Sequence, residues 1–225
     1  MKHNFNTLIA LLVAVLAAQQ VSNAQIPVMV WDFENIKNRS TIESSTGIAD
    51  TIEGNFEWVD GVTGKGLRLD GFTTRVIRNG EEITKPGTAF TIEAWVSLGE
   101  YPLNWCPVIT TESDEVKGYR LMIGPYGQVS FETAISEQWI SCTSANETIP
   151  LRQWMHITGT FIAGKEMRLY VNGDLAVSVP IKGSVSYDNS ANCIIGMVAV
   201  PEKPSDIHRT WGTVEAFYGL DGIID

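Results

Sequence analysis

The best-placed pair of carboxylates for acid–base chemistry is Glu112 and Asp114. They lie two residues apart in the segment Glu112-Ser113-Asp114-Glu115, so on an extended chain both side chains would point the same way. Hydrolysis of a glycosidic bond uses such a pair, with the carboxyl groups about 5 to 9 Å apart. The segment runs on into Val116-Lys117-Gly118, which is typical of a solvated hairpin loop and not of an apolar strand. The loop interpretation is therefore favoured over catalysis.

The rest of the sequence offers no stronger catalytic motif. There is no GxSxG segment and no His-rich metal motif, and Gly64-Lys65-Gly66 lacks the spacing of a phosphate-binding loop. His156 follows Trp154 in an alternating segment, so we expect a structural, hydrogen-bonded role for it. Glu93 is a lone carboxylate and is expected to pair with a residue on a neighbouring strand. No catalytic residue is assigned, and whether the chain is an enzyme stays open.

Aromatic side chains offer a second kind of chemistry, the binding of sugars. A sugar presents its C–H face to an aromatic ring and its hydroxyls to polar side chains. Five aromatic residues lie in predicted loops or at strand ends, where a ligand would reach their rings: Tyr101, Trp105, Tyr126, Trp139 and Trp211. Rings that cap the ends of the fold or pack on a neighbouring catalytic domain would show the same pattern. Both interpretations stay open.

The N-terminus and the charge of the chain predict an exported protein. An apolar run from Leu8 to Ala18 precedes Ser22-Asn23-Ala24, so residues 1–24 are expected to be a secretory signal peptide. No later stretch is long and apolar enough to span a membrane. With 16 Lys and Arg against 26 Asp and Glu, the net charge is −10, and loss of Lys2 makes it 15 minus 26, or −11. Such a charge repels nucleic acids, and we expect a secreted, periplasmic or cell-surface domain.

Three cysteines remain after cleavage, Cys106, Cys142 and Cys193, so at most one disulfide can form. A bridge, if present, is expected between Cys106 and Cys142, since both lie near tryptophans in what look like neighbouring loops. Three buried free thiols are an equally good interpretation. The spacing excludes a CxxC zinc site.

The elements that would position these residues are strands. The segment Phe90 to Leu98 alternates apolar and polar residues, which is the period of a strand with one face in a core. Asn172-Gly173 lies between two alternating runs, which strongly indicates a hairpin. Strands are predicted over residues 28–33, 55–59, 67–69, 72–77, 90–98, 108–111, 119–123, 128–133, 154–162, 167–171, 175–179 and 193–200, with a long polar connection at 34–51. Without a sustained helical period, this pattern predicts an all-β domain, an antiparallel two-sheet β-sandwich with jelly-roll topology.

Four motifs, in their order and spacing, are similar to those of one known family. They are Gly64-Lys65-Gly66-Leu67-Arg68-Leu69-Asp70-Gly71, Phe90-Thr91-Ile92-Glu93-Ala94-Trp95-Val96, Trp154-Met155-His156 and Met167-Arg168-Leu169-Tyr170-Val171-Asn172-Gly173. Val30 to Glu34 and Leu220 to Asp225 are similar to that family's first strand and to the start of its last. The chain thus resembles the laminin G-like jelly-roll domains of the concanavalin A-like lectin/glucanase superfamily. The resemblance implies one such jelly roll over residues 25–225, which stops before its last strand ends.

The resemblance also implies a function. Such modules in exported bacterial proteins often precede a glycoside hydrolase domain. We therefore expect a carbohydrate-recognition or accessory module of a larger glycan-degrading protein, with a polysaccharide or oligosaccharide and a downstream catalytic domain as its partners. A purely structural or protein-binding domain is the alternative, and a glycan hydrolase in its own right is the third possibility.

A metal is implied in the same way. Members of the superfamily often hold one structural calcium ion between the first and last strands, through carboxylates and backbone carbonyls. The matching acidic residues here are Asp32, Glu34 and Asp225. A solvated acidic surface is the alternative interpretation of these three residues.

Overall fold

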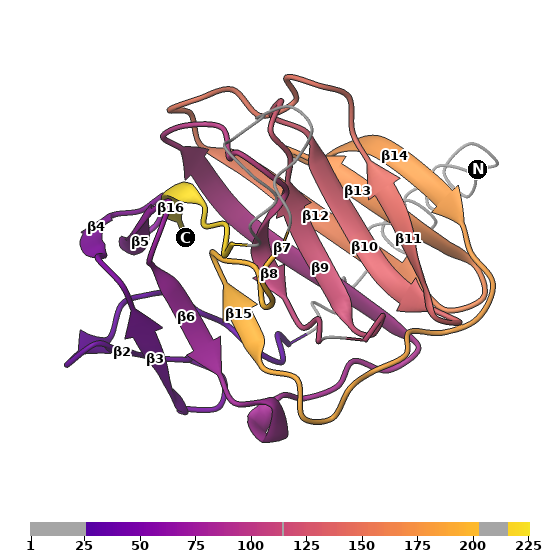
Figure 1. The fold of residues 1–225 in the computed structure, drawn as a ribbon, viewed down its shortest axis with the longest axis horizontal. Coiled ribbons are helices and arrows are strands. Elements are labelled where there is room, and N and C mark those ends of the chain that lie inside the picture. Colours follow the sequence, from indigo (N-terminus) through magenta and orange to yellow (C-terminus); the bar gives the residue numbers. More distant parts are fainter. Residues whose placement is uncertain (1–25, 114, 203–215) are drawn as a thin grey trace, which may run out of the picture.

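Two β-sheets face each other in the computed structural model, which describes residues 26–113, 115–202 and 216–225 (Figure 1). Within these residues the first sheet has nine strands, in the order β1 (Ile36–Lys37), β2 (Ser40–Ile42), β3 (Ala49–Glu53), β6 (Arg75–Arg78), β15 (Cys193–Ile195), β8 (Cys106–Thr110), β9 (Tyr119–Ile123), β10 (Val129–Ile135) and β11 (Gln138–Thr143). The second has seven, in the order β14 (Asp174–Pro180), β13 (Glu166–Val171), β12 (Met155–Ile162), β7 (Ala89–Leu98), β16 (Asp221–Ile224), β5 (Lys65–Asp70) and β4 (Glu57–Asp60). The strand pairs are antiparallel, so the predicted all-β, two-sheet antiparallel sandwich is confirmed.

Helical structure in the described residues is limited to one short 3₁₀ helix, η1 (Gly80–Glu82). In the part of the chain that the structure describes, there is no helix with the length and apolar character needed to cross a bilayer.

The core lies between the two sheets and is built by alternate residues of the central strands. In β7 Val96 is fully buried, and β12 contributes Phe161 beside the same core. Phe131 of β10 faces them from the other sheet, so close that a Cβ atom on Gly159 of β12 would lie 2.4 Å from its ring. The predicted strand from Phe90 to Leu98 is central, since β7 pairs with β12 on one side and β16 on the other.

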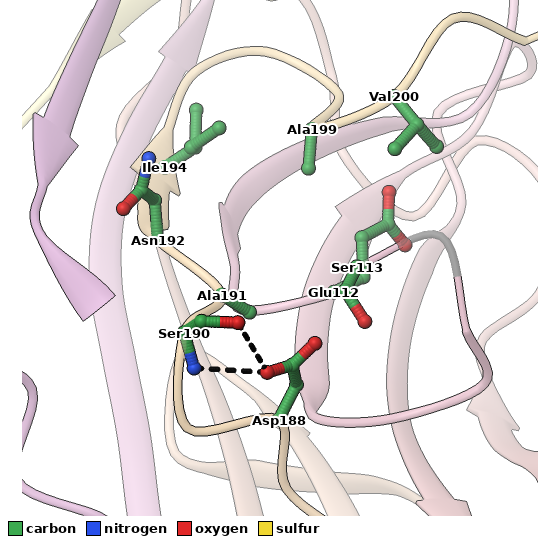
Figure 2. Close-up of a pocket in the computed structure, with 9 residues that line it drawn as sticks. All are labelled: Glu112, Ser113, Asp188, Ser190, Ala191, Asn192, Ile194, Ala199 and Val200. Carbon is green, nitrogen blue, oxygen red and sulfur yellow. Dashed lines mark hydrogen bonds between the residues drawn. The ribbon is translucent and has the colours of Figure 1, made fainter. Parts of the chain in front are cut away.

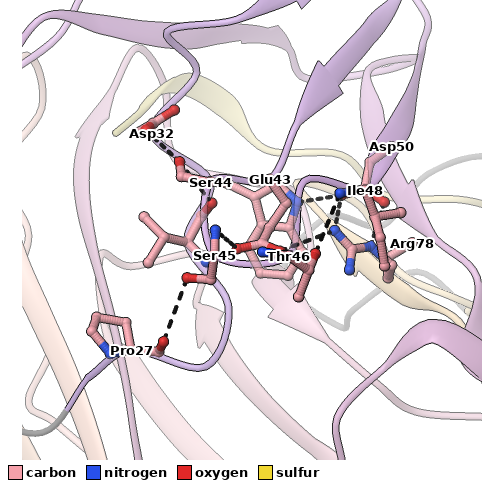
Figure 3. Close-up of polar contacts among 11 residues, drawn as sticks. Pro27, Asp32, Glu43, Ser44, Ser45, Thr46, Ile48, Asp50 and Arg78 are labelled. Carbon is pink, nitrogen blue, oxygen red and sulfur yellow. Dashed lines mark hydrogen bonds and ion pairs between the residues drawn. The ribbon is translucent and has the colours of Figure 1, made fainter.

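The N-terminal part differs most from the sequence-based prediction. Residues 28–33 form no strand, and the predicted connection 34–51 contains β1, β2 and the start of β3. Two carboxylates in this region are buried although the sequence around them is polar: Glu43, just after β2, is 0% exposed, and Asp50 of β3 is 2% exposed. Both carboxylates pair with the buried guanidinium of Arg78 in β6 (Figure 3). Pairing with a cation offsets the cost of removing a carboxylate from water, and this partner is distant in the sequence.

A two-stranded ribbon, residues 196–202 with 216–220, leaves the sandwich after β15. The strand predicted at 193–200 is cut short because Gly196 adopts a left-handed φ of +86°. Beyond this glycine, the N–H of Val198 donates to the carbonyl of Tyr218 at 3.0 Å. The ribbon carries Glu202 toward the nine-stranded sheet, where its carboxylate accepts a 3.0 Å hydrogen bond from Asn104 Nδ2.

The three cysteines are free and buried, so the expected bridge between Cys106 and Cys142 is wrong and the free-thiol interpretation is confirmed. Cys106 belongs to β8 and Cys142 to β11, with two strands between them in the sheet. Three steps of about 4.8 Å separate those strands by about 14 Å, well beyond the reach of a disulfide.

Candidate functional site

A row of charged side chains crosses the outer face of the nine-stranded sheet. Leu121 of β9 and Phe131 of β10 point into the core, so their neighbours Arg120 and Glu132 point outward, and the register places these two directly opposite each other. Glu132 in turn lies opposite Ser141 of the edge strand β11. Figure 1 shows β8, β9, β10 and β11 side by side along this half of the sheet.

Arg120 is the centre of this row. Its Nε donates to Glu132 Oε2 at 2.8 Å, its Nη1 donates to Glu112 Oε2, and its guanidinium carbon lies 4.3 Å from the ring centroid of Trp139. Burial alone would lower the pKa of Arg120, but the charges of Glu132 and Glu112 raise it above its ordinary value. Ser130, which is buried, donates to the other oxygen of Glu132 at 2.8 Å. The guanidinium is therefore held in one position against one face of the indole.

The edge strand β11 presents a half-exposed surface next to this row. Trp139, Ser141 and Thr143 alternate along β11 with Cys142, whose side chain is in the core. Ser141 and Thr143 are exposed and Trp139 is half-buried. We call Trp139, Ser141 and Thr143, with Arg120 and Glu132 beside them, the outer strip. Sequence patterns assigned Trp139 to a loop or strand end and missed β11, because its residues show no clean apolar alternation.

Glu112 is buried, although the segment that follows it, Glu115 to Gly118, forms no strand and begins with an exposed residue, as expected for the predicted loop. Its residue is only 5% exposed, one carboxylate oxygen is bound by Arg120, and the other, Oε1, has no hydrogen-bond partner. The polar residues that follow Glu112 in the sequence indicate exposure to water, whereas its ion-pair partner, Arg120, lies on the next strand, β9. Asp114 is outside the described residues, so the predicted carboxylate pair is not tested.

A cavity of about 300 Å³ opens beside Glu112. Figure 2 shows Glu112 and Ser113 on one side of it, Asn192 and Ile194 opposite, Asp188 and Ser190 below, and Ala199 and Val200 above. The N–H and hydroxyl of Ser190 both donate to Asp188 Oδ1 at 2.8 Å. The lining of the cavity thus combines two carboxylates, those of Glu112 and Asp188, with aliphatic side chains.

Glu202 adds a third carboxylate to this face. Burial first, and then the negative charge of Glu112, raise the pKa of Glu202 to about 7, while Arg120 acts in the opposite direction. The ribbon thus places near Arg120 a group that gains and loses a proton near neutral pH.

Three of the predicted aromatic residues gather around the hairpin Gly124 to Gly127. The ring of Trp105 packs directly on Gly124, since a Cβ atom added to this glycine would lie only 2.8 Å from Cη2 of the ring. The ring of Tyr101 packs in the same way on Gly127, where an added Cβ atom would lie 2.8 Å from Cε1. The hydroxyl of Tyr101 donates to the carbonyl of Ile149 at 3.0 Å. Tyr101 and Trp105 thus pack against the hairpin backbone and are half-buried, whereas Tyr126 is 46% exposed. Trp139 lies at the other end of the sheet, and Trp211 lies outside the described residues.

The three predicted calcium ligands do not form one cluster. Glu34 Oε1 accepts the N–H of Lys65 at 2.7 Å, and Asp225 Oδ2 accepts the N–H of Val62 at 2.6 Å, so both carboxylates bind the same turn. Asp32 instead accepts the N–H of Glu34 at 3.1 Å. The described residues contain no group of three His, Cys, Asp or Glu side chains that could hold a metal ion. These three carboxylates together therefore do not fit one ion, and calcium held by fewer of them with backbone carbonyls stays a prediction.

The remaining polar predictions concern the other sheet. Glu93 of β7 lies with Oε2 3.6 Å from Nε2 of His156 on the neighbouring strand β12, as expected for a cross-strand pair. The ring centroids of His156 and Trp95 are 4.9 Å apart. His156 thus packs on this sheet, away from the charged row.

Comparison with known proteins gives a family and a set of similar folds. Residues 70–205 match the family model of the concanavalin A-like lectin/glucanases superfamily. No curated protein sequence matches the chain.

Among solved structures, domain 4 of an extracellular GH43 arabinanase from Geobacillus stearothermophilus, in complex with arabinotriose, is similar with a TM-score of 0.53 and 17% identity over 81% of this chain and 84% of that one. A structure of botulinum neurotoxin type C, whose cell entry depends on interaction with two ganglioside molecules, is similar with a TM-score of 0.59 and 15% identity over 87% of this chain and 47% of that one. The binding domain of Paraclostridial Mosquitocidal Protein 1 has a TM-score of 0.58 and 17% identity over 84% and 46%. The chain spans about half the length of the two toxin structures, and identities this low show a shared fold alone.

The family model covers more than half of the 225 residues, and the antiparallel two-sheet sandwich agrees with it. The chain belongs to the concanavalin A-like lectin/glucanase superfamily.

Proposed function

We propose that this chain is an exported carbohydrate-recognition module of a larger glycan-degrading protein and that it binds its glycan along the outer strip. The observation that carries the proposal is the arrangement at Trp139, whose indole is fixed by Arg120 on one face and lies next to exposed hydroxyls on an edge strand. A ring beside hydroxyl and charged groups matches a sugar, which has an apolar face and polar edges.

The dimensions of the strip suit several sugar units. From Trp139 to Thr143 the strand advances four residues at about 3.3 Å each, or about 13 Å. Past Thr143, the exposed Asn146 receives a 2.8 Å hydrogen bond from Gln128 Nε2, and the exposed ring of Tyr126 follows. Two structurally similar proteins interact with sugar-containing ligands, arabinotriose and gangliosides, which supports the same class of ligand for this chain.

A binding module of this kind works through proximity. When one part of a polypeptide holds a polysaccharide, the local concentration of substrate rises for a catalytic domain attached to it. The signal peptide at 1–24, the downstream catalytic domain and a structural calcium ion belong to the same proposal.

Retention on polysaccharide gels tests the proposal. Trp139→Ala and Tyr126→Ala should each weaken binding about 2- to 13-fold, the range that an aromatic contact contributes. Phe72→Ala is the matched control, because Phe72 is 76% exposed in the turn after β5 and lies outside the strip. If the wild-type domain is retained by no polysaccharide, the proposal fails and the structural or protein-binding alternative takes its place.

Hydrolysis by the domain itself is the second candidate, and one observation favours it. Glu202, with its pKa raised to about 7, lies near Glu112, and a proton donor beside a carboxylate is the arrangement that glycoside hydrolysis uses. Release of reducing ends from a retained polysaccharide, lost in Glu202→Gln, would establish it. Binding without any turnover excludes this candidate and leaves the recognition module.

A further inference from the structure

We propose that the cavity beside Glu112 is a subsite that holds a single sugar unit. The inference rests on the proposed function, since it extends the glycan-binding surface from the outer strip across Arg120 to β15. A volume of about 300 Å³ is at the lower end of the range for ligand pockets, which limits the occupant to a small molecule or one unit of a chain.

One carboxylate oxygen of Glu112 lacks a hydrogen-bond partner. Arg120 binds Oε2, while Oε1 is buried and has no hydrogen-bond partner although the residue is only 5% exposed. An unsatisfied buried acceptor of this kind is costly and rare in folded proteins. A hydroxyl that enters the adjoining cavity would donate to it after a small movement of the carboxylate. Glu112 would then hold the strip in place with one oxygen and the ligand with the other.

A second carboxylate, Asp188, lines the same cavity. Hydrogen bonds from the N–H and hydroxyl of Ser190 lower the pKa of Asp188 to about 2, so a second acceptor is ionised across the same space. Glu112 shares Arg120 with Glu132, and Lys117, which is paired with Glu115, acts on Asp188 only through its charge. The two carboxylates therefore present hydrogen-bond acceptors to the cavity, which suit the several O–H donors of a polyol.

Part of the cavity lining is apolar. Ile194 lies across the cavity from Glu112, and Ala199 and Val200 lie across it from Asp188 and Ser190 (Figure 2). Asn192 adds an amide whose Oδ1 is held by the N–H of Gly80 at 3.0 Å. A ring with a C–H face and several hydroxyls is complementary to both kinds of surface at once.

Nuclear magnetic resonance of the whole chain locates the ligand. The probes are arabinose, xylose, glucose, fructose and arabinotriose, each added separately to the amide-labelled protein. At least one probe should shift the backbone amides of Ser113, Asp188, Ser190 and Asn192. Absence of shifts at these residues with every probe would overturn the inference.

Three variants test whether the ligand occupies the cavity. Glu112→Gln should weaken binding of the shifting probe about tenfold or more, because a hydrogen bond to a charged group is lost. Ala199→Trp fills the cavity without touching the contacts of Arg120, and it should abolish the shifts even if Glu112→Gln fails to fold. Phe72→Ala, an exposed position outside both the cavity and the outer strip, should leave the monosaccharide shifts in place. Equal binding by wild type and Ala199→Trp would contradict the subsite.

The two proposals fail in different ways. Retention on a polysaccharide without amide shifts at the cavity refutes the subsite and leaves the recognition module intact. Monosaccharide shifts at the cavity without retention on any polysaccharide support the subsite and refute the outer strip as a glycan-binding surface.

Discussion

Replacement of Glu43 by Gln should destabilise the fold because one carboxylate holds the N-terminal segment in place. Figure 3 shows its contacts. Oε1 accepts the N–H of Val30 at 2.6 Å and of Ser45 at 2.7 Å, while Oε2 accepts the N–H and hydroxyl of Thr46. Oε2 also lies 3.6 Å from Arg78 Nη2. A Gln side chain has one acceptor oxygen, so its amide group would face donors at the other position.

The pKa of Glu43 sets the size of the effect. Burial alone would raise it, but the hydrogen bonds from Thr46, Val30 and Ser45 outweigh burial and lower it from 4.5 to about 2. Each unit of pKa change is equivalent to about 1.4 kcal/mol, so the lowered pKa of Glu43 corresponds to about 3 kcal/mol in favour of the folded state. Because the folded-state pKa is the lower one, this stability is complete above about pH 4.5 and is lost as the pH falls toward about 2.

Urea denaturation of wild type and Glu43→Gln at neutral and acidic pH measures how much the Glu43 carboxylate contributes to the free energy of unfolding. The free energy of unfolding should differ by about 3 kcal/mol near pH 7, with a melting midpoint lower by about 6 to 12 °C, and the difference should shrink steadily below about pH 4.5. Glu53→Gln is the control, because it removes a half-exposed ion pair with Arg75 and should cost less than about 1 kcal/mol. The same difference at pH 7 and at about pH 2 would refute the reasoning.

Three further outcomes are expected. Gly159→Ala should cost about 1 to 3 kcal/mol, because its Cβ would lie 2.4 Å from the ring of Phe131, whereas Gly87→Ala, with open space around it, should be neutral in the same denaturation experiment. Glu202 has a folded-state pKa of about 7, above its ordinary 4.5, so its contribution to stability is present below about pH 4.5 and is lost as the pH rises through about 7. The melting midpoint of Glu202→Gln should therefore lie above that of wild type near pH 8, and equal midpoints at that pH would contradict this expectation. Calcium bound through Asp32, Glu34 or Asp225 should raise the melting midpoint over that measured in chelator, and an unchanged midpoint removes the calcium prediction.

Local pattern was enough to find the strands that face the core. The alternation of Phe90 to Leu98 identified the central strand β7, and Asn172-Gly173 identified the hairpin between β13 and β14. Both signals are local, because a strand with one face in the core must alternate and a tight hairpin must use residues that tolerate positive φ. Asn172 and Gly173 adopt φ of +52° and +84° as that turn requires.

Local pattern misled where burial depends on a partner. Glu43 and Asp50 look solvated in the sequence, and only the approach of Arg78, in β6, makes their burial favourable. Glu112 lies in the loop after β8, and its burial likewise depends on Arg120 of β9. Polar residues at these positions hide β1 to β3 from any reading of hydrophobic period.

The sequence by itself thus determined the fold class, the family and the aromatic residues that are candidates for sugar contact. Only the tertiary structure decided which of these candidates share a surface: Trp139 joined the charged row, while Tyr101 and Trp105 packed against a hairpin. The physical reason is that alternation and turn chemistry act between near neighbours in the chain. Charge pairing, stacking and the cavity beside Glu112 instead depend on strand order and register, which bring together residues far apart in the sequence.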